Sequence, residues 1–285
     1  MEIEGSRVLV TGASSGIGRE AARAFAAAGA EVVAVARRAE RLAALEAESA
    51  GAVSVITADL SEPGAAARVA ERAGPVDVLV NGAGSETGGT VWAVGDRDEA
   101  RRMFEVDWWS PLAMIAALVP GMRERRAGAV VNVTSIRQVL AWPSLGHSAA
   151  AKAALAQLTS TLRLELLDTG VSVIEVIPGP VDTPALGASM LLPGFVEVLD
   201  GMLGTGTAAE LAELIVRAVR DEHERVFYPA VTVEHAYHRP MELRAAITDA
   251  VRERGRLPDE LADTLVVGPD SPIIADAKAA WEHAR

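Results

Sequence analysis

The segment Val8–Glu20 constrains the fold of this chain more than any other part of its sequence. It consists of an apolar run, a loop that contains Gly12, Gly16 and Gly18, and the start of an amphipathic helical pattern. A helix that begins on such a loop directs unpaired backbone N–H groups and the positive end of its dipole at the loop, which suits a pyrophosphate. An ordinary glycine-rich turn has the same glycines, but a second apolar run follows at 31–36. We therefore predict a nucleotide-binding fold.

The composition of the chain is consistent with one large domain. Of its 285 residues 50% are hydrophobic, enough for a substantial α/β core. The net charge of −12 argues against nucleic acid or an anionic membrane as a partner. The absence of cysteine excludes disulfides and fits a reducing cytoplasm. Because residues 1–7 lack an apolar signal core and no segment is long and apolar enough to span a bilayer, we predict a cytoplasmic protein.

Apolar runs and helical patterns alternate along most of the chain, which is typical of a parallel sheet wound on both faces. We predict a single Rossmann-type α/β domain over residues 1–230, with a doubly wound parallel sheet and helices on both faces. The two longest helices are expected at about 96–122 and 148–167, and the strands at 8–10, 31–36, 52–58, 76–80, 129–134, 171–177 and 225–229.

Residues 231–285 are predicted to form a C-terminal helical extension packed on the same domain. Pro240 suits the first position of a helix. Leu243, Ile247 and Val251 then fall on one stripe of that helix. An apolar stripe needs a partner, so we expect the extension to pack against the substrate side or against a neighbouring subunit.

Six short motifs give the chain a specific resemblance. They come in the order and spacing of the classical short-chain dehydrogenase/reductase family, and the resemblance covers roughly Ser6 to Pro229. The motifs are Thr11–Gly18 (TGASSGIG), Asp59–Leu60, Asn81–Gly84 (NGAG), Asn132–Ser135 (NVTS), Lys152 and Pro178–Thr183 (PGPVDT). The resemblance implies a Rossmann fold and a nicotinamide dinucleotide as cofactor.

The resemblance also implies which residues hold that cofactor. The glycine loop would hold the pyrophosphate, Asp59 would contact the adenine ring and Thr183 would lie near the nicotinamide amide, while Asn81 steadies the central strands. Asp59 and Asn81 would serve equally well in turns at strand ends. The predicted cofactor set is Gly12, Ser14, Ser15, Gly16, Ile17, Gly18, Arg37, Asp59, Leu60, Asn81, Ala83, Gly84, Lys152, Pro178, Gly179 and Thr183.

The choice between NAD and NADP is predicted from charge. NAD binding usually needs a carboxylate at the end of the second strand, to accept a hydrogen bond from the ribose 2′-hydroxyl. This chain has Ala36 there, followed by Arg37 and Arg38. A guanidinium binds a 2′-phosphate through charge-assisted hydrogen bonds. We predict NADP(H), with Arg37 preferred over the alternative that both arginines only begin a solvated helix.

The chain keeps the catalytic tetrad of the resembled family only in part. Ser135 and Lys152 match its serine and lysine. Ser148 stands where the resemblance places the tyrosine, four residues before the lysine, and Asp107 replaces the asparagine. Both tyrosines of the chain lie far downstream. Redox activity therefore requires another source for the proton.

A serine hydroxyl is far too weak an acid to replace a phenol, and general acid–base catalysis is typically worth about 10²–10⁴-fold in rate. Ser148 precedes an alanine-rich helix, so we favour an N-cap or a small space-filler over a catalytic serine. His147 is the nearest titratable alternative, although most loop histidines have no such role. The candidate catalytic set is Ser135, Lys152, Ser148, His147 and Asp107.

Asp107 has a second interpretation because Pro111 follows four residues later in the same predicted helix. The proline ring displaces the carbonyl of residue 107 and removes its hydrogen bond, and the freed carbonyl can hold a water. In the resembled family such a water joins the lysine to a proton relay. An ionised Asp107 would also keep Lys152 charged, or it would only solvate the kink.

Side chains around this centre indicate the substrate. Arg137, Gln138 and Trp142 are the predicted substrate-pocket residues, and Trp108 and Trp109 also lie on segments that border the site by resemblance. Tryptophan there suggests an aromatic or polycyclic substrate, although tryptophan on a helix is more often core or subunit contact. No metal site is predicted.

Two functions remain open from the sequence. The first is an NADP(H)-dependent oxidoreductase that acts on a small organic substrate with a non-standard proton donor. The second is a redox-silent protein that binds NADP(H) and either catalyses a cyclisation, isomerisation or elimination or acts as a binding protein. The helices at 96–122 and 148–167 match those that pair between subunits in the resembled family, which implies a homodimer or homotetramer.

Overall fold

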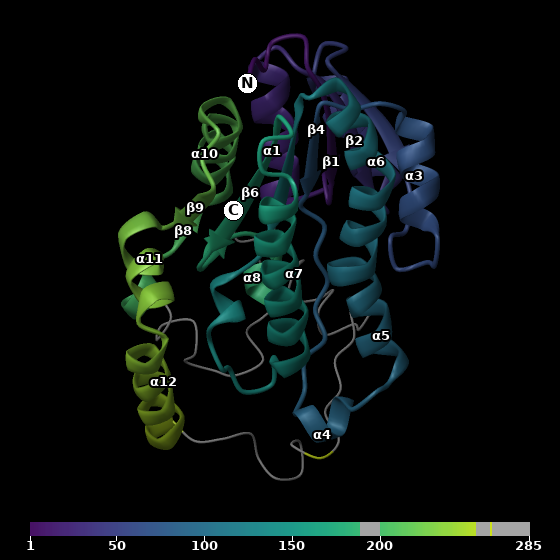
Figure 1. The fold of residues 1–285 in the computed structure, drawn as a ribbon. Helices are drawn as coiled ribbons and strands as arrows, with labels where there is room; N and C mark the ends of the chain where they lie inside the picture. Colours follow the sequence, from purple (N-terminus) through teal and green to yellow (C-terminus); the bar gives the residue numbers. More distant parts are fainter. Residues whose placement is uncertain (189–199, 255–262, 264–285) are drawn as a thin grey trace.

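The computed structural model describes residues 1–188, 200–254 and 263 (Figure 1). A seven-stranded sheet forms its centre, in the order β3-β2-β1-β4-β5-β6-β9, and every pairing in it is parallel. The strands are β1 (Arg7–Thr11), β2 (Glu31–Ala36), β3 (Val53–Thr57), β4 (Val78–Asn81), β5 (Gly128–Val133), β6 (Val171–Pro178) and β9 (Arg225–Tyr228). The predicted doubly wound α/β fold is confirmed.

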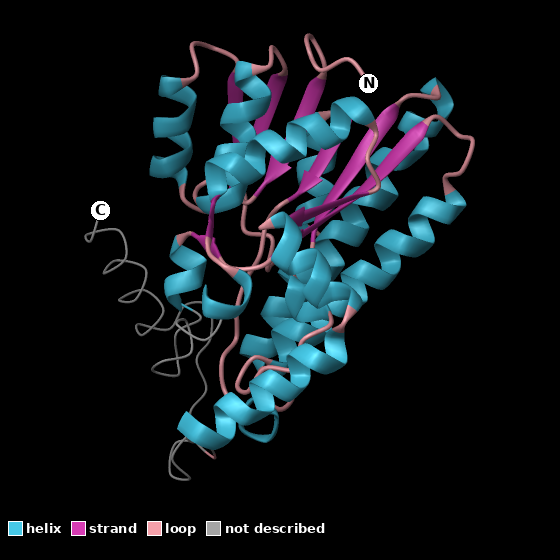
Figure 2. Cartoon of the chain, turned by 90° about the vertical axis from the view of Figure 1, so that its left-hand side faces the viewer, coloured by secondary structure: helices cyan, strands magenta, loops and turns pink. Residues whose placement is uncertain are grey.

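Helices cover both faces of this sheet (Figure 2). One face packs on α1 (Gly16–Ala27), α2 (Ala39–Glu48) and α10 (Ala208–Asp221). The other packs on α3 (Ala65–Ala73), α6 (Ser110–Arg125) and α7 (Gly146–Glu165). Every residue of β4 and β5 is buried, as expected for central strands covered on both faces.

The long helix predicted at 96–122 is interrupted. It consists of α5 (Asp98–Phe104), a π-helical turn η1 (Glu105–Trp109) and α6. Pro111 has no N–H to donate to the carbonyl four residues earlier, so the regular hydrogen-bond ladder cannot continue there. The consequence is that Asp107 lies on the widened turn and is buried.

The predicted N-cap at Ser148 is wrong. Helix α7 begins at Gly146 with Leu145 at its cap, so Ser148 lies inside the first turn. The sequence favours a cap there because alanines follow the serine, but the backbone becomes helical two residues earlier. Ser148 is buried and faces other partners, described below.

The C-terminal part of the described chain forms α11 (Ala230–His238) and α12 (Pro240–Arg254), which follow α10 along one side of the molecule (Figure 1). Helix α12 begins at Pro240, as predicted. Ile247 is buried in an apolar cluster with Leu140 and Trp142, and Val251 packs against that cluster. These helices therefore support the segment that follows β5. Of the predicted extension, residues 255–262 and 264–285 lie outside the described residues.

Candidate active site

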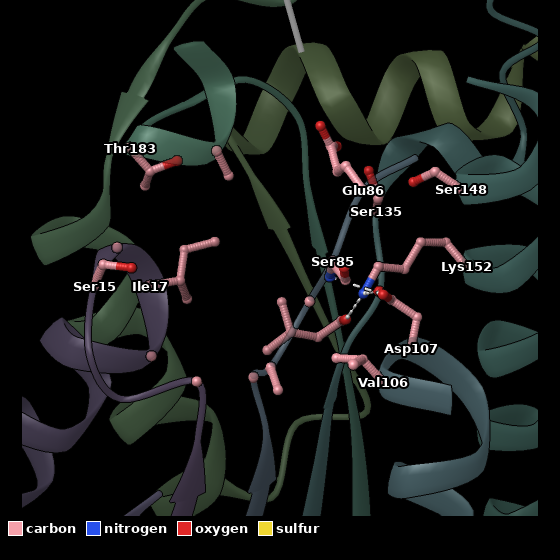
Figure 3. Close-up of a pocket in the computed structure, with 18 of the residues that line it drawn as sticks. Ser15, Ile17, Ser85, Glu86, Val106, Asp107, Ser135, Ser148, Lys152 and Thr183 are labelled. Atoms are coloured by element: carbon pink, nitrogen blue, oxygen red, sulfur yellow. Dashed lines mark hydrogen bonds and ion pairs between the residues drawn. The ribbon is translucent and has the colours of Figure 1, made fainter. Parts of the chain in front are cut away.

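A single pocket extends from the glycine loop after β1 to the first turn of α7. Its walls come from the ends of β1, β2, β4, β5 and β6, where open parallel sheets bind their ligands. In Figure 3, Ser15, Ile17 and Thr183 lie across the pocket from Ser148, Lys152 and Asp107. Of the predicted site residues it is lined by Gly12, Ser14, Ser15, Gly16, Ile17, Gly18, Arg37, Asp59, Leu60, Ala83, Gly84, Asp107, Ser135, Arg137, Trp142, Ser148, Lys152, Pro178, Gly179 and Thr183.

The glycines of the first loop are required by close backbone contacts. A Cβ on Gly12 would lie 2.7 Å from the carbonyl oxygen of Gly82, and one on Gly18 would lie 2.5 Å from the carbonyl oxygen of Gly12. Gly12 also has a φ of +77°. The turn after β4 is fixed by Thr11, whose hydroxyl accepts from the N–H groups of Gly82 and Ala83 at 3.1 Å each. Helix α1 begins at Gly16, so its unpaired N–H groups border the pocket.

The two arginines after β2 are both in this wall. The Arg38 guanidinium donates to the hydroxyls of Ser14, at 2.9 Å, and Ser15, at 2.6 Å. Arg37 Nη1 lies 3.6 Å from Asp59 Oδ2. The prediction placed the 2′-phosphate contact on Arg37, and the structure shows Arg38 on the same wall, held against the glycine loop. Arg38 was considered in the sequence analysis. Its contact with the glycine loop, more than twenty positions away, could not be predicted there because it depends on the pairing of β1 with β2.

Asp59 is a charged residue in the pocket wall beside Arg37. Burial alone would raise the pKa of its carboxyl, but hydrogen bonds from the Ser61 N–H and hydroxyl, with the charge of Arg37, outweigh burial and lower the pKa below its usual value. The carboxylate is therefore kept ionised beside the Arg37 guanidinium. It orients Arg37 while leaving a net positive charge on this part of the wall.

Three predicted site residues do not line the pocket, and two of them are Asn81 and Gln138. Asn81 is buried in the sheet, where its Nδ2 donates to Asn132 Oδ1 at 2.8 Å, and Asn132 in turn donates to Thr159. This chain of hydrogen bonds agrees with a strand-steadying role and does not border the pocket. Gln138 does not line the pocket either, and among the described residues its buried side-chain oxygen and nitrogen have no hydrogen-bond partner.

His147 points away from the pocket. Its Nε2 lies 2.8 Å from the carbonyl oxygen of Gly95, and the residue is absent from the pocket lining. It precedes Ser148 by one position on α7, a step of about 100° around a helix, which turns the imidazole to a different side. The geometry gives no support to His147 as the proton donor.

Lys152 and Asp107 form a buried ion pair at the centre of the pocket (Figure 3). Lys152 Nζ lies 2.8 Å from Asp107 Oδ1, and it also donates to the carbonyl oxygen of Val133 at 3.2 Å. Asp107 is 1% exposed and accepts from the N–H of Ser85 at 2.8 Å. Burial raises the pKa of the Asp107 carboxyl although Lys152 and the Ser85 N–H act in the opposite direction. The pair is thus a place where a proton can be held next to the pocket.

A second charged pair lies beside the two serines. Arg137 forms an ion pair with Glu86, and its Nη1 also donates to Ser148 Oγ at 3.1 Å. Ser135 Oγ accepts from the backbone N–H of Arg137 at 3.2 Å. Sequence reasoning missed Glu86. The available signal was a carboxylate two residues after the NGAG motif, on a loop that must border the pocket.

Comparison with known proteins assigns this chain to a family. The family model described as short chain dehydrogenase matches residues 6–190. The chain belongs to the short chain dehydrogenase family. The matched residues include the glycine loop after β1, called the glycine cradle below, as well as Lys152 and the Pro178–Thr183 segment.

Relatives within the short chain dehydrogenase family agree with this assignment. A short chain dehydrogenase of Pseudocercospora fijiensis is 39% identical over 197 residues, which cover 66% of this chain and 63% of that protein. Dehydrogenase/reductase SDR family member 7B of Mus musculus is 34% identical over 244 residues, 79% of this chain and 75% of that protein. The chain thus spans just under two thirds of the first of these relatives.

A solved structure agrees as well. A short chain dehydrogenase/reductase from Burkholderia phymatum, in complex with NAD, superposes with a TM-score of 0.72 at 26% identity. The match covers 86% of this chain and 97% of that one. In the pocket of this chain Lys152 is ion-paired with Asp107, and Ser148 lies four residues before Lys152 on α7. In the described part of the chain, no helix has the length and apolar character needed to cross a membrane.

Proposed function

We propose that this chain is an NADP(H)-dependent oxidoreductase that acts on small, aromatic or polycyclic organic substrates. The observation that supports it most is the continuity of one pocket, which joins the glycine cradle to Ser135, Lys152 and Asp107. A dinucleotide held by the glycine loop would have room in the same pocket to reach these polar groups. Family membership supports an oxidoreductase class, and Trp142 in the wall supports a substrate with an aromatic face.

The residues of the cradle fit the cofactor. Glycine at positions 12 and 18 lets the loop pack against neighbouring backbone, and the first turn of α1 then borders the pocket, where its N–H groups would bind a pyrophosphate. Arg37 and Arg38 supply guanidinium groups for a 2′-phosphate, with no carboxylate at Ala36 to repel it. When bound, a nicotinamide dinucleotide supplies or accepts a hydride. The residues of the chain must then bind the substrate oxygen and move one proton.

We assign the proton to the Lys152–Asp107 pair. In reduction, the Lys152 ammonium gives a proton to the oxygen of the substrate and is then reprotonated from solvent; oxidation runs the same transfer in reverse. Asp107 stabilises the charged lysine through a 2.8 Å contact. The Ser148 hydroxyl is too weak an acid for this task, and His147 faces Gly95.

The cofactor assignment is tested by binding. Dissociation constants of NADPH and NADH are measured for the unaltered protein, Arg37→Gln and Arg38→Gln. We expect NADPH to bind at least about 10-fold tighter than NADH, and each substitution to weaken NADPH by about 10-fold with little effect on NADH, as for loss of one charge-assisted bond. Tighter binding of NADH by the unaltered protein would contradict the assignment.

The reaction class is tested by turnover. The protein is incubated with NADPH and a panel of aromatic aldehydes, ketones and enones, and the absorbance of the reduced nicotinamide is followed. Turnover that is lost both in Lys152→Met and in the double variant Asp107→Asn/Lys152→Met, which no longer leaves a buried carboxylate without its cation, supports the proposal. Tight NADPH binding without turnover of any member would favour the redox-silent alternative, which the serine at position 148 keeps open.

We further propose a cytoplasmic homodimer or homotetramer. The cysteine-free sequence supports the compartment. Exposed apolar side chains on two neighbouring elements support assembly, because Trp109 is 52% exposed in η1 and Leu164 is 68% exposed in α7. Sedimentation of Trp109→Glu and Leu164→Glu tests this, and we expect a shift toward smaller species.

A further inference from the structure

Helix α4 (Val91–Val94) carries two large apolar side chains that are mostly exposed and adjacent in sequence. Val91 is 62% exposed and Trp92 is 68% exposed. A single exposed apolar residue, such as Val231 in α11, is common on protein surfaces and needs no explanation. Two in succession, one of them tryptophan, form an apolar surface that favours a partner. We call Val91 and Trp92 the α4 surface.

The α4 surface is held firmly against the start of α7. Just before the helix, the N–H of Gly89 donates to the carbonyl oxygen of Ser144 at 2.9 Å. Just after it, the carbonyl oxygen of Gly95 lies 2.8 Å from His147 Nε2. Ser148, the residue that follows His147, lines the pocket. The surface is therefore a fixed platform, anchored beside the substrate end of the pocket.

A residue from the far end of the chain already contacts this platform. The indole N–H of Trp92 donates to Asp263 Oδ1 at 2.7 Å, although 171 positions separate the two residues. In Figure 1, α4 and α12 both lie at the end of the molecule away from the N-terminus. One exposed hydrogen bond does not offset the entropy that is lost when a chain segment is ordered. Further contacts next to Asp263 are needed to hold it at Trp92.

The sequence supplies apolar side chains directly after Asp263. Leu265, Val266 and Val267 follow it by two to four positions. Each residue of a chain spans at most about 3.3–3.6 Å, so these side chains lie within about 14 Å of Asp263 along the chain. A helix of four residues is only about 6 Å long. The three side chains therefore have the reach to cover the α4 surface while Asp263 stays bonded to Trp92.

We infer that the α4 surface is the docking site of residues 264–267 of the same chain, with Asp263 as the polar anchor. Docking removes apolar area of both partners from water, and the carboxylate fixes the position of the segment on the indole. The α4 surface then joins the C-terminal part of the chain to the start of α7, beside the substrate end. The inference goes beyond the proposed function and needs neither cofactor nor turnover.

The absence of cysteine permits a direct test in the full-length chain. In Val91→Cys the only thiol lies on the α4 surface, and its reaction with N-ethylmaleimide is followed by mass spectrometry. A comparison chain carries Leu265→Ser, Val266→Ser and Val267→Ser as well. We expect the thiol to react at least about 10-fold more slowly without the three serines, as for a segment bound for about nine-tenths of the time. The control thiol, Val231→Cys, should react equally fast with and without them.

The polar anchor is tested with the same thiol. Asp263→Ala and Trp92→Phe remove one hydrogen bond from its two sides, so each should speed the reaction of Val91→Cys. Together they should speed it no more than Trp92→Phe alone, whereas Asp263→Asn keeps an oxygen acceptor and should retain most of the protection. Asp249→Ala, which removes an exposed carboxylate from α12, should change nothing. Independent, additive effects of Asp263→Ala and Trp92→Phe would show that the bond does not anchor the segment.

A disulfide identifies the occupant. Val91→Cys/Val266→Cys is oxidised by air with copper phenanthroline, and both thiols lose their hydrogen as the S–S bond forms. We expect a disulfide within one chain, at a rate that does not change when the protein is diluted, and none within one chain in Val231→Cys/Val266→Cys. A disulfide between two chains would place the segment of a second copy on the surface and overturn the inference. Equal thiol reactivity with and without the three serines, or protection without an internal disulfide, would overturn it as well.

Discussion

The two ends of the pocket are built in different ways. The cofactor end consists mainly of backbone: a glycine turn, the start of α1 and the turn after β4, held by contacts such as that of Gly18 with Gly12. The substrate end consists of side chains from separate elements, with Asp107 on η1, Lys152 on α7 and Glu86 on a loop. A site made of closely packed backbone tolerates few amino-acid substitutions. A site made of side chains from separate elements can be altered by single substitutions.

The largest effect is expected at the substrate end, in Lys152→Met. It leaves the carboxyl of Asp107 buried without its cation, and breaking a buried pair in this way costs about 3–5 kcal/mol of unfolding free energy. Urea unfolding at neutral pH measures it. The double variant Asp107→Asn/Lys152→Met should recover most of the loss. If both variants were equally unstable, the pair would not be the cause.

A somewhat smaller effect is expected from Ile247→Ala in α12. Truncation of a buried isoleucine typically costs about 2–5 kcal/mol, and here the cavity lies in the cluster that supports Trp142. We expect a raised KM for the substrate with an unchanged dissociation constant for NADPH, which would show that the extension supports only the substrate end. Thr248→Ala, at an exposed neighbouring position, is the control. If Ile247→Ala weakened NADPH binding as much as it raised the substrate KM, the extension would support both ends of the pocket and the contrast would be lost.

The cofactor end is tested by Gly18→Ala. The added Cβ would lie 2.5 Å from the Gly12 carbonyl oxygen, so the loop must shift. Overpacking of about 1–3 kcal/mol would weaken NADPH binding by about 5- to 150-fold. Gly201→Ala, where an added Cβ meets nothing within 4 Å, is the matched control. NADPH titration by fluorescence decides, and equal affinities for the two variants would show that the cradle is more adaptable than its contacts indicate.

The smallest effect concerns pH. Burial raises the pKa of Asp107 in the folded chain, so its contribution to stability is greatest below the ordinary carboxyl pKa and is lost as pH rises through the folded value. The stability of the unaltered protein relative to Asp107→Asn should therefore fall with rising pH, by about 1.4 kcal/mol for each unit by which the pKa is raised. Unfolding free energies of both proteins between pH 4 and 8 measure this. A relative stability that increases with pH would mean that Lys152 outweighs burial.

Much of the fold, and the glycine turn at one end of the pocket, could be predicted because both depend on local sequence. The alternation of apolar runs and helical patterns predicts the parallel sheet, and a glycine whose Cβ would meet backbone is recognisable from its place in a strand–turn–helix motif. Pro111 predicts the interruption of its helix for the same reason, because a missing N–H is a property of one residue. These features need no knowledge of distant contacts.

The substrate end was decided by tertiary structure. Glu86 and Arg137 are 51 residues apart by their numbers (137 − 86), and nothing in either segment predicts their ion pair. Ser148 has the local features of an N-cap, but α7 begins earlier and the hydroxyl is directed to Arg137. His147 is the more plausible acid by side-chain chemistry, yet its imidazole faces Gly95. The sequence by itself determined which residue types are available; the packing of η1, α7 and the loops after β4 and β5 determined which of them meet, because direction and burial depend on residues far apart in the chain.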